Sequence, residues 1–161
     1  LAIAEKTKQV LTERGYQVIM TRESNDVNMS WAERARLAEK SGADALIHIH
    51  AHSQESTSVT GVLASCQSSG NPYNGDLASE SYALSSCIAG SVSQAAGAKN
   101  RGVKQTDTSS EINWSQVPVT ALETGFLSNQ QEELLLSQEE YQSRIAVGIA
   151  DGLDQFFAGR R

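Results

Sequence analysis

The spacing of apolar residues predicts a chain in which helices and strands alternate. Apolar positions that recur every three or four residues predict helices over residues 1–14, 30–40, 76–96 and 139–157. The second helix begins at Ser30 with Glu33 at the capping-box position, which is a typical helix start. Runs of aliphatic and β-branched residues predict strands over residues 16–22, 45–52, 59–67 and 117–126. Residues 97–116 have no clear period and are expected to form a long loop.

Alternating helices and strands are typical of the α/β class. We therefore expect a three-layer structure with a twisted, mostly parallel sheet and helices on both faces. A length of 161 residues with 39% hydrophobic residues suits one compact core. The sequence thus predicts a single domain over residues 1–161.

Charge and cysteine content exclude several classes of protein. The formal net charge of -6 argues against nucleic-acid binding, which needs clustered Lys and Arg. No run of about eighteen apolar residues occurs, so we expect no membrane insertion. The two cysteines, Cys66 and Cys87, do not have the spacing of a metal-binding pair and are expected to be free thiols rather than a disulfide. We expect the protein to act as a monomer.

All three histidines of the chain lie in one predicted strand. His48, His50 and His52 alternate with apolar residues, so the two-residue period of a strand places them on one face. Two imidazoles at positions i and i+2 of a strand can share one zinc ion. The pattern indicates a possible metal site, but the spacing does not choose among the three histidines.

One carboxylate interrupts the apolar strand over residues 117–126. A Glu such as Glu123 is rarely buried unless it is paired, hydrogen-bonded or bound to a metal. It could lie on an edge strand and face water or an Arg. In the functional alternative it lies beside the histidine face, where it could act as a general base next to a metal-bound water.

The long aperiodic segment before this strand is a candidate wall of a substrate groove. Long loops in compact domains are often functional, and Asn113 and Trp114 lie close in sequence to the strand that carries Glu123. Asn113 is the predicted substrate-binding residue. In the alternative, the loop only packs against the core through Trp114.

Several ordered sequence blocks resemble the Amidase_3 family of N-acetylmuramoyl-L-alanine amidases. The resemblance runs over almost the whole chain, and the ordered set is more specific than any single block. The most specific pieces are the Ile-His-Ala and Glu-x-Gly-Phe-Leu-Ser-Asn segments. The blocks lie at Leu1–Ala4 with Leu11, Gly15–Val18, Thr21–Arg22, Arg34 with Ala38, Ala43–Ala51, Asn100–Lys104 and Val117–Asn129.

This resemblance implies a zinc site with two histidines and one glutamate as ligands and a further glutamate as base. It assigns a zinc ligand to His50 and the base to Glu123. His48 and His52 are not ligands by this resemblance, because the family usually has Ser and Asn there. The other two ligands of the family precede the position of Leu1, so we expect the domain to be incomplete at its N-terminus. Glu5 is expected to be a solvated helix residue and no substitute for them.

The activity implied by the resemblance is hydrolysis of the amide bond between N-acetylmuramic acid and L-alanine. The substrate would be peptidoglycan or a muropeptide, and the protein would be secreted or associated with the cell wall. Two alternatives remain open: an inactive peptidoglycan-binding module of the same fold, and another zinc hydrolase such as a carboxypeptidase or deacetylase.

Overall fold

The structure is a computed structural model that describes residues 1–160. Helices and strands are interspersed along these residues but do not alternate strictly. The helices are α1 (Ala2–Glu13), α2 (Trp31–Lys40), α3 (Ala78–Ala96), α4 (Ser110–Asn113), α5 (Gln130–Leu136) and α6 (Glu139–Ala158), and a single 3-10 turn, η1 (Gly75–Leu77), precedes α3. The strands are β1 (Leu46–His52), β2 (Val62–Cys66), β3 (Asn100–Gln105) and β4 (Val119–Phe126).

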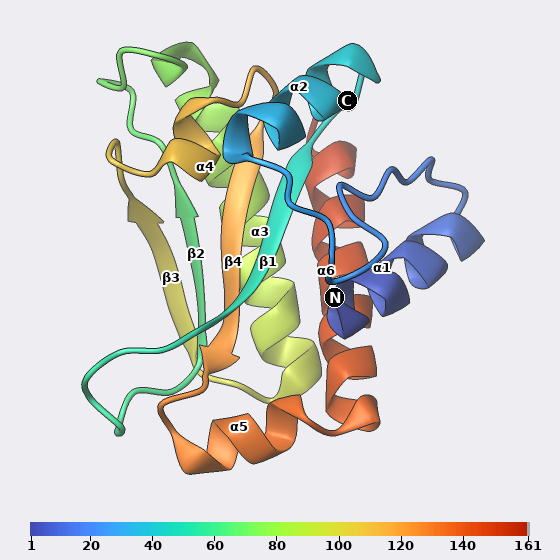
Figure 1. The fold of residues 1–161 in the computed structure, drawn as a ribbon, viewed down its shortest axis with the longest axis vertical. Coiled ribbons are helices and arrows are strands. Elements are labelled where there is room, and N and C mark those ends of the chain that lie inside the picture. The colour runs from blue at the N-terminus through green and yellow to red at the C-terminus, as the bar shows by residue number, and fades with distance from the viewer. Residues whose placement is uncertain (161) are drawn as a thin grey trace.

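The strands of the described chain form one mixed sheet in the order β1-β4-β2-β3 (Figure 1). The pairs β1·β4 and β2·β3 are parallel, and the β2·β4 pair is antiparallel. The central position of β4 agrees with its sequence, since seven of its eight residues are buried. The predicted mixed, mostly parallel sheet is confirmed.

Helices cover both faces of this sheet. On one face, α3 packs against the strands with α6 beside it, and the main core lies between them (Figure 1). On the other face, α2 and α4 lie over one end of the sheet, and Ala38 and Ile112 pack against Leu46, Val119 and Ala121. The predicted α/β class with three layers is therefore confirmed.

The start of α2 follows the predicted capping box. The Ser30 side chain accepts a hydrogen bond from the Glu33 backbone N–H at 3.3 Å, and the Ser30 backbone N–H donates to the Glu33 carboxylate at 2.8 Å. These reciprocal bonds satisfy two backbone donors at the helix start. They fix where α2 begins and so place Trp31 over the histidine face of β1.

Two predicted elements are wrong. Residues 16–22 form no strand, because their backbone has no ladder partner among the described residues. Residues 97–116 are not one loop, because they contain β3 and α4. The strand β3 escapes a search for apolar runs because it lies at the sheet edge and is largely exposed. The short helix α5 was also not predicted.

A cavity of about 590 Å³ is lined by residues 16–22 and by β1. Its lining includes Val18 and Met20 on one side and Ile47, His48 and His50 on the other. Within residues 1–160, β1 pairs only with β4, so its other edge borders this space.

Two smaller expectations, on the cysteines and on Glu5, also hold in the described residues. Cys66 and Cys87 are free thiols. Glu5 is exposed on α1, as expected for a solvated helix residue. No helix among residues 1–160 is long and apolar enough to cross a membrane.

Candidate metal and catalytic site

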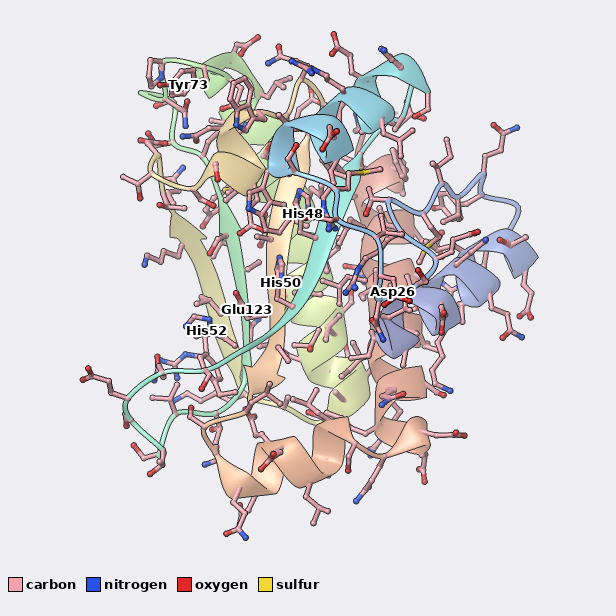
Figure 2. The ribbon with its side chains drawn as sticks, viewed as in Figure 1. Asp26, His48, His50, His52, Tyr73 and Glu123 are labelled. Carbon is pink, nitrogen blue, oxygen red and sulfur yellow. The ribbon has the colours of Figure 1, made fainter. Side chains whose placement is uncertain are left out.

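The histidine face of β1 lies beside Glu123 of β4. The two strands are parallel, and their register pairs His50 directly with Glu123. Figure 2 shows His48, His50 and His52 in succession along the sheet, with Glu123 beside His50. The predicted proximity of His50 and Glu123 is confirmed, and it follows from the strand pairing and not from flexible side chains.

Glu111 is a carboxylate that sequence reasoning missed. It lies in α4, where its Oε2 is 2.8 Å from Nε2 of His50. The hydrogen bond to Glu111 raises the pKa of His50, whereas burial of the imidazole opposes the shift. Burial raises the pKa of Glu111, but the hydrogen bond and charge of His50 outweigh it and leave that pKa below its usual value. Both shifts favour the charged form of the side chain, with the imidazole protonated and the carboxylate ionised.

His48 is the most deeply buried of the three histidines, with 5% of its surface exposed. Its ring meets the Trp31 indole edge to face, with 5.3 Å between ring centroids. Its Nε2 is buried and has no hydrogen-bond partner within residues 1–160. Burial lowers the pKa of His48 to about 4, so the imidazole is neutral near pH 7. A neutral imidazole has a free lone pair, which is the form that binds metals.

Glu123 is half-buried and has one free carboxylate oxygen. Its Oε1 lies 3.7 Å from Nδ1 of His52, and its Oε2 is buried without a hydrogen-bond partner in the described chain. Burial raises the pKa of Glu123, although the charges of His50 and His52 lower it in part. A carboxylate with a raised pKa and a free oxygen is suited to accept a proton.

Three donor groups of this face are close enough to share one ion. One ligand atom each from His48, His50 and Glu111 lies within 4.8 Å of the others. Two imidazoles and one carboxylate are a common ligand set for catalytic zinc. The unpartnered Nε2 of His48 is a further reason to consider a metal, because buried polar atoms are normally paired. These three side chains could therefore hold a metal ion.

Asn113 lies in a network that joins two loops. Its Oδ1 accepts a hydrogen bond from Asn71 at 2.8 Å, and its Nδ2 donates to the Asp107 carbonyl at 2.8 Å. Asn74 donates to the carbonyls of Ile112 and Ser115, and so also supports α4. Because both the oxygen and the nitrogen of the Asn113 amide are hydrogen-bonded within the protein, this side chain positions α4. A direct contact of Asn113 with substrate stays a prediction.

The alternative role for this segment, packing through Trp114, is wrong. The Trp114 side chain is 55% exposed, and the residue of this segment that packs into the core is Ile112. The exposed indole lies next to α4, which carries Glu111. The prediction that residues 97–116 form a wall of the substrate groove remains a prediction.

The fold and the site define an α/β protein in which two histidines of the sheet and a glutamate of α4 form a cluster that could hold a metal ion. Residues 1–155 match the Amidase_3 family, described as N-acetylmuramoyl-L-alanine amidase. The chain belongs to this family.

Individual relatives agree with this assignment. The chain is 31% identical to the uncharacterized protein YqiI of Bacillus subtilis, with 98% of this chain and 72% of that protein covered. It is 30% identical to the N-acetylmuramoyl-L-alanine amidase LytC of the same organism, with 98% of this chain and 30% of LytC covered. The solved catalytic domain of CwlV, an N-acetylmuramoyl-L-alanine amidase from Bacillus (Paenibacillus) polymyxa var. colistinus, is 30% identical with a TM-score of 0.84. That match covers 98% of this chain and 82% of the CwlV chain.

Proposed function

We propose that this chain belongs to an enzyme that hydrolyses the amide bond between N-acetylmuramic acid and L-alanine in bacterial peptidoglycan. The family match and the likeness to the CwlV catalytic domain support this activity. The observation that carries the proposal is the pairing of His50 with Glu123 across β1 and β4. This pairing puts a potential metal ligand next to a potential proton acceptor.

The cofactor in this proposal is zinc, with His50 as one ligand. When bound, zinc lowers the pKa of a bound water and polarises the substrate carbonyl. The imidazole of His50 is only partly buried, so an ion on this face is open to substrate. Trp31 packs against the His50 ring with 5.9 Å between centroids and restricts its orientation.

Glu123 is the proposed general base. Its free Oε2 would take a proton from the attacking water and pass it to the departing amine of L-alanine. The products are the lactyl carboxylate of N-acetylmuramic acid and a peptide with a free N-terminal L-alanine. The raised pKa of Glu123 supports both halves of this transfer, because the carboxylate must first accept and then release the proton.

We further propose that the complete domain has an additional strand next to β1. The cavity of about 590 Å³ between residues 16–22 and β1, together with the free edge of β1, supports this proposal. A strand there would pair the outer backbone groups of β1 and give residues 16–22 a partner. The catalytic domain is proposed to act as a monomer on peptidoglycan, secreted or associated with the cell wall.

The test is Glu123→Gln in the longest natural form of the protein that contains this chain. Gln nearly keeps the shape of Glu but cannot accept the proton, so release of L-alanyl peptides from muropeptide should fall about 100- to 10,000-fold. Zinc content and thermal stability should stay close to those of the parent. Glu133→Gln changes an exposed glutamate of α5 and is the matched control.

Near-normal turnover in Glu123→Gln would show that Glu123 is not the base. A parent that binds muropeptide without releasing peptide would instead support a binding module. Cleavage at a different bond of the muropeptide would indicate another class of zinc hydrolase.

A further inference from the structure

The sheet face that carries Glu123 continues past β4 onto β2 and β3. Leu63 of β2 pairs with Glu123, and Ser65 lies two residues further along β2, so both side chains point to this face. Lys104 of β3 is the register partner of Ser65 and therefore lies on the same face. The preceding residue, Val103, packs against the main core on the opposite face, which agrees with this orientation of Lys104.

This part of the face is open. On the opposite face the side chains of β2 are fully buried, whereas on this face Leu63 and Ser65 are only half-buried and Lys104 is exposed. The helices on this face, α2 and α4, pack on β1 and β4 instead. Figure 1 shows no helix in front of β2 and β3 over most of their length. A substrate bound beside Glu123 therefore has uncovered sheet next to it.

Lys104 is a cation of this face without a partner in the described chain. Its ammonium group takes part in no ion pair within residues 1–160. Arg101, the other cation of β3, donates a hydrogen bond to the Thr60 carbonyl at 3.3 Å. The nearby carboxylate of Asp107 accepts hydrogen bonds from the loop over residues 68–71. Lys104 is therefore available to an anion that arrives with the substrate.

The strand register sets the separation between Lys104 and the proposed base. Neighbouring strands are about 4.8 Å apart, and β3 lies two strands from β4. Lys104 is also offset from Glu123 by two residues along the strands, so their Cα atoms are about 12 Å apart. Extended peptide spans about 3.4 Å per residue, so about three residues reach from one to the other.

The charge of the proposed substrate indicates which of its halves meets Lys104. The lactyl carboxyl group of N-acetylmuramic acid is part of the amide bond and carries no charge before cleavage. The peptide half keeps its carboxylates, including the one at its C-terminus. An exposed ammonium group therefore complements the peptide half and not the glycan half.

We propose that Lys104 binds a carboxylate of the stem peptide, so that the peptide runs from Glu123 across β2 to β3. The glycan half then lies on the side of β1. This inference rests on the proposed amidase activity and adds the direction in which the substrate lies on the site. Lys104 acts on substrate recognition and does not touch the bond that is cleaved.

The experiment compares two muropeptides, one with free peptide carboxylates and one in which these carboxylates are amidated. The enzyme is the longest natural form of the protein that contains this chain. Lys104→Gln should raise KM for the free form about 2- to 5-fold, as expected for the loss of one exposed ion pair. The kcat value should not change, because only binding of the peptide is weakened. For the amidated form, KM should be equal in Lys104→Gln and in the parent.

Two further variants separate a local ion pair from a general effect of charge. Lys104→Arg keeps the positive charge and should retain the KM of the parent for the free form. Lys99→Gln is the matched control, since Lys99 is an exposed lysine just before β3, about 16 Å from Lys104 along the chain. It removes the same charge and should leave KM for both muropeptides unchanged.

Several outcomes would overturn the role of Lys104. Unchanged KM for the free form in Lys104→Gln is one, and an equal rise for the free and amidated forms is another. An equally large effect of Lys99→Gln would show that overall charge, and not an ion pair at Lys104, controls KM. In each of these cases the proposed amidase activity stands, because the parent still releases L-alanyl peptide. A parent that releases no L-alanyl peptide would overturn both the proposed function and this inference.

Discussion

Glu132 is a buried carboxylate that joins α5 to the ends of two other segments. It is 7% exposed, and its Oε1 accepts a hydrogen bond from the Gly61 backbone N–H at 2.6 Å. Its Oε2 accepts one from the Phe126 backbone N–H at 2.7 Å. Phe126 is the last residue of β4, so this bond anchors the end of the strand that carries Glu123.

Glu132→Ala should therefore destabilise the protein strongly. Hydrogen bonds to a charged group contribute about 1.5 to 3 kcal/mol each, and Ala would leave two backbone donors unpaired. The cost of burying the carboxylate offsets part of this gain, so we expect a loss of about 3 to 4 kcal/mol. For a chain of 161 residues, this corresponds to a fall in Tm of roughly 6 to 16 °C.

The assay is urea unfolding followed by circular dichroism at pH 7. Glu132→Gln keeps one acceptor oxygen and should lose about half as much stability as Glu132→Ala. Glu133→Ala removes the neighbouring exposed glutamate of α5 and should change stability by less than about 0.5 kcal/mol. Equal unfolding midpoints for Glu132→Ala and Glu133→Ala would refute the assigned role of the two hydrogen bonds.

Four further perturbations have definite expected outcomes. Gly152→Ala would place a Cβ 2.6 Å from Cα of Ile88, so it should cost about 1 to 3 kcal/mol in urea unfolding. A Cβ added by Gly90→Ala has no atom within 4 Å, so this substitution should stabilise α3 by up to about 1 kcal/mol. A loss of stability would contradict the open space at this position. Ser30→Ala removes the cap of α2 and should cost about 1 kcal/mol by the same assay, and no change would exclude a role for the capping box. For His48, burial lowers the folded pKa to about 4, so the unfolded chain binds more protons between pH 6.5 and pH 4 and stability falls as pH decreases. Metal-free His48→Gln should lose less stability than the parent between pH 6.5 and pH 4, and parallel pH profiles would contradict the assignment.

Local sequence patterns were sufficient to predict several helices and strands. The capping box at Ser30 specifies the start of α2, because both of its bonds form within one turn of the chain. The alternation in β1 places three histidines on one face, because side chains of a strand alternate between its two faces. The apolar run of β4 indicates a central strand, since such a strand is buried on both sides.

Elements that depend on a distant partner were not predictable in this way. Residues 16–22 have the composition of a strand, but a strand needs a neighbour to bond its backbone, and the structure places a cavity there. The strand β3 has few apolar residues, and its pairing with β2 defines it. Local sequence therefore predicted a strand at residues 16–22, where none forms, and missed the strand β3.

The candidate site shows the same division. The sequence by itself determined that His50 and Glu123 lie in apolar strands, and the family resemblance selected them among the polar residues. Only the tertiary structure decided that Glu111 meets His50, because these residues are 61 positions apart and belong to different layers. It likewise decided that Nε2 of His48 is buried without a hydrogen-bond partner among residues 1–160 and that Asn113 supports α4. Periodicity reports which face a side chain occupies, whereas contacts between faces depend on strand order, register and loop packing, which no local pattern encodes.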